Sequence, residues 1–206
     1  EMMMDTTKGV KGVLVLLTAL LLAGCAAKSP NVDFYVLNTD AGPLAGVADS
    51  CSSQAISVGP VDWPRYLDQP RIVTRIGSNR LEANEFHRWA GSLEDDFTRT
   101  VVENLSGMLH SELVVNYRRS SRFSPAYRVE MEVLQFDGQL GGDVVLHVKW
   151  GIIEEASGKY VLVTASNISK AVAGSDYDAL VSASSMALAQ LSEDIAVQLA
   201  KLCTAR

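Results

Sequence analysis

The sequence is short of the residue types on which most enzymes build an active site. It has three histidines and three cysteines in 206 residues, and aromatic side chains make up 7% of it. His87, His110 and His147 have no Cys, His or acidic partner at metal-ligand spacing. No G-x-S-x-G elbow, Ser-x-x-Lys dyad or glycine-rich phosphate loop before a helix occurs. We therefore expect no catalytic residues, no metal site and no cofactor, in a protein that is not an enzyme.

Positive charge is also scarce. The 18 Lys and Arg residues are outnumbered by 24 Asp and Glu residues, which gives a formal net charge of −6. An acidic chain is a poor general ligand for nucleic acid or for anionic membrane surfaces. We therefore expect no nucleic-acid partner, and we expect a lipid to provide any attachment to a membrane.

The chain has one long apolar run, and it lies close to the first residue. Lys8 and Lys11 precede the apolar segment 13–23, which is too short to span a bilayer comfortably because about 20 residues are needed. A basic start, a short apolar core and small residues at its end are typical of a secretory signal peptide. We expect residues 1–24 to be this peptide and to be removed.

The end of the run resembles a lipobox, the cleavage site of bacterial lipoproteins. Leu22, Ala23 and Gly24 stand directly before Cys25, so we expect cleavage before Cys25 and covalent diacylglycerol and N-acyl chains, such as palmitate, on that residue. Each buried CH₂ contributes about 0.8 kcal/mol, so several chains anchor a protein firmly. Ala26 is not Asp, which resembles the sorting rule for export to the outer membrane. The alternative is a plain signal peptide, or a short membrane anchor, with an incidental cysteine.

The other two cysteines are candidates for a disulfide. Exported proteins fold in an oxidising compartment, where Cys51 and Cys203 would close a loop of about 150 residues. Chain-entropy models make such a bond worth up to about 5 kcal/mol. The alternative is two free thiols that lie too far apart to meet.

After a lipidated tether over 25–32, the pattern predicts a single domain over 33–206. Turn residues and alternating apolar side chains predict strands in several segments, of which the last three form an antiparallel meander; the segments are 33–39, 55–61, 71–76, 80–84, 111–119, 126–136, 144–153 and 160–172. Apolar residues at every fourth position predict a first helix that includes Trp89 and ends near Leu109. A second helix is expected over about 176–202, capped by Ser175 or Asp176. This order predicts an α+β fold, a two-layer sandwich with a mostly antiparallel sheet and two long helices packed on one face.

Two surface features are candidates for contact with a partner. Arg118, Arg119 and Arg122 form the densest basic cluster and could contact a phosphate or a lipid headgroup, although a solvated loop is the simpler interpretation. His147 is expected on the solvent-facing side of a strand. We treat the three arginines and His147 as a candidate contact surface.

Five segments occur together and in a fixed order: FYVL (34–37), ISVGPVDWPRYLDQPRIV (56–73), RWAGSLEDDFTRTVVENL (88–105), YRVEMEVLQFDGQLGGDVVLHVKW (127–150) and GSDYDALVSASSMALAQLSEDIA (174–196). In this combination they resemble the PqiC-like lipoproteins, a family also called the ABC-type transport auxiliary lipoprotein component. One departure is Trp63, inserted before Pro64. Cys51 and Cys203 are not part of the family pattern.

The resemblance implies a role rather than a reaction. Such a lipoprotein would sit on the periplasmic face of the outer membrane, as a non-catalytic part of an MCE/ABC-type system that carries phospholipid between membranes and supports membrane integrity. Its implied partners are an MCE-domain tunnel protein, which it would dock at the outer membrane, and through that protein an inner-membrane permease. A ring-shaped homo-oligomer would suit a tunnel, because cyclic symmetry matches cyclic symmetry.

Two other functions stay open. A periplasmic lipid-binding module, or an outer-membrane assembly chaperone, would hold an acyl chain in an apolar pocket between sheet and helices. A hydrolase of cell-envelope material would bring a nucleophile and a base together in one cleft.

Overall fold

The computed structural model describes residues 31–40, 42, 51–122 and 124–204. The described residues from Val32 onward belong to one compact unit. The expected signal peptide and the lipidation site at Cys25 lie outside the described residues. The elements, in chain order, are β1 (Asp33–Tyr35), β2 (Ile56–Asp62), η1 (Arg65–Leu67), β3 (Arg71–Gly77), β4 (Arg80–Trp89), α2 (Leu93–Leu109), β5 (Val114–Asn116), η2 (Tyr117–Arg122), β6 (Tyr127–Gly138), β7 (Asp143–Glu154), β8 (Lys159–Ala171) and α3 (Tyr177–Thr204).

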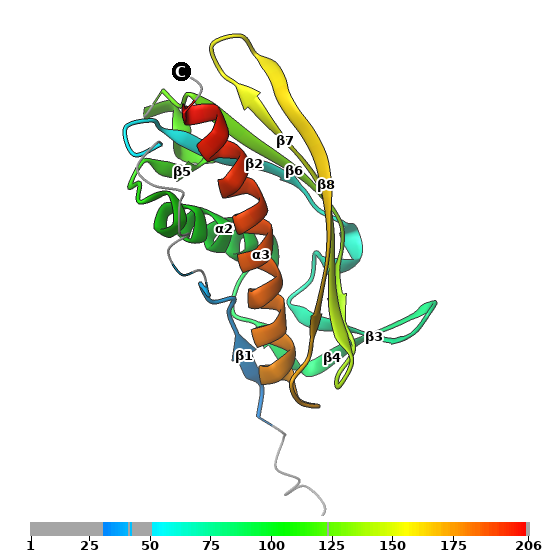
Figure 1. Cartoon of the computed structure of the whole chain (residues 1–206). Helices are drawn as coiled ribbons and strands as arrows, with labels where there is room; N and C mark the ends of the chain where they lie inside the picture. Colours follow the sequence, from blue (N-terminus) through cyan, green and yellow to red (C-terminus); the bar gives the residue numbers. More distant parts are fainter. Residues whose placement is uncertain (1–30, 41, 43–50, 123, 205–206) are drawn as a thin grey trace, which may run out of the picture. The chain divides into compact units, whose positions relative to one another are not determined.

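The eight described strands form one sheet around β6 (Figure 1). β7 pairs with one side of β6 and β8 pairs with β7, both antiparallel. The other side of β6 is shared by β2 and the end of β3. The parallel pairings, β1 with β4 and β2 with β5 and β6, are shorter than the antiparallel ladders of β6 with β7 and β7 with β8. The predicted meander and the predicted hairpin of β3 and β4 are both present.

Both long helices lie on one face of this sheet (Figure 1), which confirms the predicted two-layer α+β fold. The side chains between the layers include several that are fully buried: Phe97, Leu105, Leu109, Leu146, Ile152, Leu188, Leu191, Ile195 and Leu199. Burying one such side chain stabilises the fold by about 1.5–3 kcal/mol. The interior is therefore a packed core that joins α2 and α3 to β6 and β7.

The small residues of α3 let the two helices pack closely. Ser184, Ser185 and Ser192 are buried, and each hydroxyl donates to the carbonyl four residues earlier, at 2.9, 3.0 and 2.8 Å. This back-bonding satisfies a buried hydroxyl within its own helix. Ser192 Oγ also accepts a hydrogen bond from Asn104 Nδ2 of α2 at 3.3 Å, so one polar contact links the helices inside the apolar layer.

The first helix begins later than its apolar spacing predicts. Trp89 is the last residue of β4, paired with Tyr35, and helix α2 starts at Leu93. The Ser92 hydroxyl accepts from Asp95 N at 3.3 Å, and this N-cap fixes the helix start. Placing Trp89 on the helix was wrong, because a strand end followed by a capped helix can also keep a four-residue spacing. For α3, the Asp176 carboxylate accepts from Ala179 N at 2.8 Å, as expected of one of the two predicted caps.

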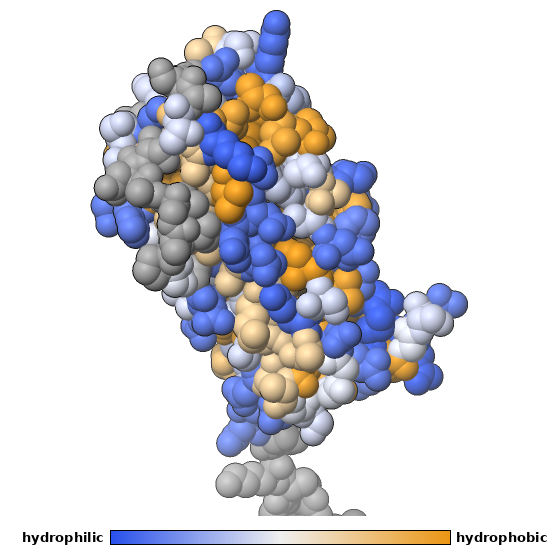
Figure 2. Space-filling view, in the orientation of Figure 1, coloured by the Kyte–Doolittle hydropathy of each residue, from blue (hydrophilic) through white to orange (hydrophobic). Residues whose placement is uncertain are grey.

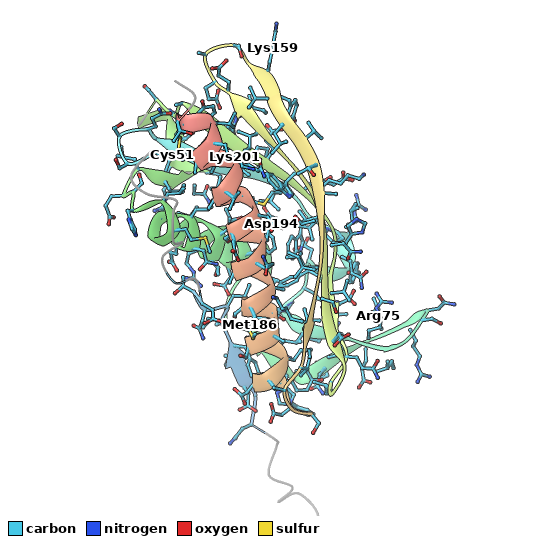
Figure 3. The ribbon with its side chains drawn as sticks, in the orientation of Figure 1. Cys51, Arg75, Lys159, Met186, Asp194 and Lys201 are labelled. Atoms are coloured by element: carbon cyan, nitrogen blue, oxygen red, sulfur yellow. A yellow bond between two sulfur atoms is a disulfide. The ribbon has the colours of Figure 1, made fainter. Side chains whose placement is uncertain are left out.

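Cys51 and Cys203 are joined by a disulfide between the segment before β2 and the last turn of α3. Figure 3 shows Cys51 beside the end of α3 that carries Lys201. The bond spans a sequence separation of 152 residues, so nearly all of the domain lies inside one covalent loop. Of the helices in the described part of the chain, none has the length and hydrophobicity needed to cross a bilayer.

Candidate docking surfaces

Two of the segments that carry the family resemblance, 56–73 and 127–150, meet at one buried carboxylate. Asp137 of β6 accepts two hydrogen bonds from Arg75, from Nε at 2.8 Å and Nη2 at 2.9 Å. Tyr66 of η1 donates its hydroxyl to the same carboxylate at 2.7 Å, and Gln135 Nε2 donates at 3.0 Å. The Asp137 side chain is 1% exposed. This Asp137 cluster, formed with Tyr66, Arg75 and Gln135, fixes η1 and the β3–β4 hairpin to the end of β6.

The electrostatics of the Asp137 cluster are those of a structural ion pair. Burial alone would raise the pKa of Asp137, but the hydrogen bonds from Arg75, Tyr66 and Gln135 outweigh it and hold that pKa below its ordinary value. Burial, together with the hydrogen bond to Asp137, raises the pKa of Tyr66. The carboxylate is therefore charged and fully engaged, and its lone pairs are directed at the protein rather than at a ligand.

The residues beside Asp137 bring both helices to the sheet. Phe136 makes edge contacts with Phe97 of α2 and with Trp63, with ring centroids 5.6 and 6.3 Å apart. The inserted Trp63 is thus half-buried and packed against the core. At Gly138 a Cβ atom would lie 2.9 Å from Leu180 Cδ1 of α3, so a larger residue would force neighbouring side chains to move. The Phe-Asp-Gly sequence is therefore a packing junction.

A second junction joins the first family segment to the start of α3. The His87 ring stacks on Tyr177 with centroids 4.0 Å apart, and its Nδ1 lies 2.8 Å from the Tyr35 hydroxyl. Close by, Asp96 of α2 accepts from the backbone N–H of Leu37 at 2.6 Å. His87 thus serves to hold β1 on the domain, and Asp96 holds the residues that follow β1.

The predicted basic cluster is partly neutralised. Arg118, which is 68% exposed, pairs with Asp95 at 2.9 Å and Glu94 at 3.1 Å, both in the first turn of α2. Arg119 is exposed, and the side chain of Arg122 lies outside the described residues. Arg118 therefore stabilises the helix start, as a surface ion pair worth at most about 1 kcal/mol.

The face of the sheet that α2 and α3 leave uncovered is the other predicted contact surface. We call it the outer face and define it by Arg128, Glu130, His147, Lys149 and Tyr160. His147 is half-buried in β7 between Gln135 and Asn167 of the neighbouring strands. Arg128 pairs with Glu130 and with Glu155, the latter at 2.6 Å, and Lys149 pairs with Glu132 at 3.2 Å. Opposite charges on neighbouring strands thus neutralise much of the outer face.

One contact connects the outer face to the basic segment. The guanidinium of Arg128 lies 5.2 Å from the centroid of the Tyr117 ring, which precedes Arg118 in η2. The Tyr160 hydroxyl donates to Glu130 at 2.5 Å, and a Cβ on Gly151 would lie 2.8 Å from the Tyr160 ring. η2 and the outer face are therefore continuous. Among the described contacts, none joins His147 directly to Arg118 or Arg119.

The outer face ends at β8, which pairs only with β7 among the described strands. Val161 and Val163 of β8 are exposed, at 43% and 69%. An edge strand of 13 residues with exposed apolar side chains offers backbone hydrogen bonds to an added strand. β8 is the longest edge strand among the described strands.

A groove of about 360 Å³ runs between β8 and α3. Its lining includes Leu162 and Val197 but also Glu193 and Asp194. The Asp194 carboxylate, which Figure 3 labels on α3, accepts a hydrogen bond from Ser166 Oγ at 2.7 Å. Figure 2 shows the surface here as a mixture of apolar and polar patches. Acidic groups in the lining make the groove a poor site for an acyl chain.

The described residues give little evidence of a catalytic or metal-binding site. They contain no group of three or more His, Cys, Asp or Glu side chains that could hold a metal ion. The polar clusters around Asp137, Arg128 and Asp96 are ion pairs and hydrogen bonds that hold elements together. These clusters therefore have a structural role.

Comparison with known proteins identifies the family to which the chain belongs. The family model described as the ABC-type transport auxiliary lipoprotein component matches residues 35–196. The intermembrane transport lipoprotein PqiC of Escherichia coli (strain K12), and that of Shigella flexneri, are each 26% identical to this chain over 141 residues, which cover 68% of this chain and 73% of the relative. The crystal structure of protein XCC0632 from Xanthomonas campestris has a TM-score of 0.68 at 17% identity, over 80% of this chain and 93% of that chain, and therefore shares the fold. The predicted PqiC-like family is confirmed, and the chain belongs to the ABC-type transport auxiliary lipoproteins.

Proposed function

We propose that this protein is a non-catalytic component of an MCE/ABC-type system that transports phospholipid between membranes. Acyl chains on Cys25 anchor it to the periplasmic face of the outer membrane. There it binds the end of an MCE-domain tunnel protein and so docks that protein at the outer membrane. Through that protein it is connected to an inner-membrane permease. The lipobox Leu22-Ala23-Gly24-Cys25 and membership of the auxiliary lipoprotein family support the anchor and the transport role.

The observation that carries the docking proposal is the outer face with its edge strand β8. The two long helices leave this face uncovered, and β8 extends one side of it with Val161 and Val163 exposed. Paired charges make the face polar yet nearly neutral, which suits a protein surface better than a phospholipid. A ring of copies of this chain, in which β8 lies at the contact between subunits or with the tunnel, would match the symmetry of a tunnel.

The test is affinity purification of the full-length, lipidated protein from solubilised envelopes, with mass spectrometry of both proteins and lipids. Recovery of an MCE-domain protein supports the proposal. Val163→Glu should abolish that recovery, whereas Met186→Glu, at an exposed position of α3, should leave it intact. Equal recovery with both variants would contradict the assignment of the β8 edge. Light scattering that finds a monomer, with and without the tunnel protein, would contradict the ring.

The alternative of a lipid-binding module or assembly chaperone makes a different prediction in the same experiment. It expects stoichiometric phospholipid and no MCE-domain partner. The side chains that fill the space between sheet and helices weigh against it, because an acyl chain there would have to displace Phe97, Leu146 or Leu188.

A further inference from the structure

Strand β1 exposes apolar side chains to solvent. Phe34 is 66% exposed, and Val32 and Val36 are 37% and 47% exposed. Tyr35, between them, points the other way, toward His87 and Tyr177. Because side chains alternate along extended chain, Val32, Phe34 and Val36 lie on the side opposite Tyr35. Phe34 and Val36 also border a hollow that is lined by Asp178 and Val181 of α3.

Strand β4 adds a second aromatic residue to this side. Phe34 pairs with Arg88 and Asp33 pairs with His87 in the parallel ladder of β1 and β4. Since His87 stacks on Tyr177 of α3, its neighbours Phe86 and Arg88 point the opposite way. Phe86 is 41% exposed. We call Val32, Phe34, Val36 and Phe86 the apolar strip.

The charge beside the apolar strip is positive on the side of β4, whereas Asp40 and Asp178 lie beside Phe34 and Val36 on the other side. Arg71 pairs with Glu85 at 2.6 Å, and Arg88 pairs with the same carboxylate at 3.4 Å. Two guanidinium groups share one carboxylate, so this group keeps a net positive charge. Asp33, the acidic residue of β1, lies 3.7 Å from His87 on the opposite side. Apolar side chains bordered by arginine are suited to the boundary between lipid headgroups and acyl chains.

The position of the apolar strip in the chain limits what it can meet. Val32 follows Cys25 by seven residues, which span at most about 25 Å when fully extended. Figure 1 places β1 at the opposite end of the domain from the turn between β7 and β8, where Figure 3 labels Lys159. A lipid anchor on Cys25 would therefore keep β1, and not the far end of β8, next to the bilayer.

We propose that the apolar strip docks on the bilayer that holds the lipid anchor. This inference rests on the proposed acylation of Cys25. Phe34, Phe86, Val32 and Val36 enter the boundary between headgroups and acyl chains, and the net positive group of Arg71, Arg88 and Glu85 faces lipid phosphates. The anchor and the strip together are two attachments, which is what stable and oriented membrane binding requires. The domain then stands with the β7–β8 turn directed away from the membrane.

The test places a fluorescent reporter in the apolar strip and a matched one far from it. Full-length protein, acylated on Cys25, is reconstituted in vesicles of phosphatidylethanolamine and phosphatidylglycerol, with and without brominated acyl chains. Phe34→Trp reports on the strip. Val163→Trp is the control, because its position is equally exposed, at 69% against 66%, but lies on β8. Wild type gives the background from the three native tryptophans.

The expected result is that brominated chains lower the added emission of Phe34→Trp by about twofold or more, because the ring reaches the acyl boundary, and leave that of Val163→Trp unchanged. Two results would overturn the docking without contradicting the lipid anchor. One is equal quenching at both positions; the other is no quenching at either position in protein that floats with the vesicles. Protein that does not float would overturn the anchor and the docking together. A blue shift at residue 34 that grows with protein concentration, without quenching, would assign the strip to a second copy of the chain and overturn its contact with lipid.

Discussion

Replacing Asp137 with Asn removes the charge around which Tyr66, Arg75 and Gln135 are arranged. The amide keeps one oxygen acceptor, but its NH₂ group faces Arg75 in either orientation, together with Gln135 in one and the Tyr66 hydroxyl in the other. Breaking a buried ion pair by removing one partner costs about 3–5 kcal/mol. The Arg75 side chain is 32% exposed and can regain some hydration, so we expect the lower end, about 3 kcal/mol.

A loss of this size is a large part of the total stability of a single domain, which is about 5–15 kcal/mol. We expect the midpoint of urea unfolding, followed by circular dichroism, to fall, and Tm to fall by about 6–12 °C. The matched control is Asp62→Asn, the same change at an exposed position at the end of β2. It should change the free energy of unfolding by no more than about 0.5 kcal/mol.

The pH dependence gives an independent check of the mechanism. The pKa of Asp137 is lowered in the folded protein, so its stabilising contribution is present above the unfolded pKa of about 3.9 and is lost as pH falls through the folded value. The stability difference between wild type and Asp137→Asn should therefore be full near neutral pH and shrink in acid. A difference below about 1 kcal/mol at pH 7, or one that does not shrink in acid, would refute the role assigned to this carboxylate.

Three further changes have defined outcomes. Cys51→Ser should destabilise the oxidised protein by about 5 kcal/mol, the chain-entropy estimate for the 152-residue separation, and dithiothreitol should lower the wild type toward the variant; equal unfolding midpoints would show that the thiols are not bonded. Gly138→Ala should lower the free energy of unfolding by about 1–3 kcal/mol, because a Cβ meets Val144 at 2.8 Å and Leu180 at 2.9 Å. Its control is Gly107→Ala on α2, where nothing lies within 4 Å; this change should raise the free energy of unfolding by up to about 1 kcal/mol. Cys25→Ser should abolish incorporation of radiolabelled palmitate and the recovery of the protein in the outer-membrane fraction; labelling that persists would place the acyl chains elsewhere.

Local patterns were enough to predict most of the fold. Alternation along β6 and β7 and the turns between the last three strands identified the meander, since each signal lies within a few residues. The parallel pairings could not be obtained in this way. The contact of β1 with β4 joins residues more than 50 positions apart, and no local pattern specifies such a partner.

The site residues were harder to predict than the fold, because their roles depend on pairing. Arg118 and its acidic partners lie 23 and 24 positions apart, so the arginines appeared as a basic cluster although one is neutralised. Asp137 gave no signal beyond its place in a family segment, and its partners Tyr66 and Arg75 come from other elements. A lone Asp next to Gly138, after an alternating strand, is an ordinary turn signal, and only the fold shows that it is buried.

The disulfide also has a mechanical consequence. Residues 51–203 form a closed covalent loop. Tension between the membrane and a partner bound to the sheet therefore cannot extend the segment from β2 to α3 into a linear chain. Between Cys25 and Cys51, the 25 residues 26–50 lie outside the loop, and their fully extended length is at most about 90 Å. A protein held between a membrane and a large assembly would thus have a short extensible tether and a domain that resists unfolding under tension.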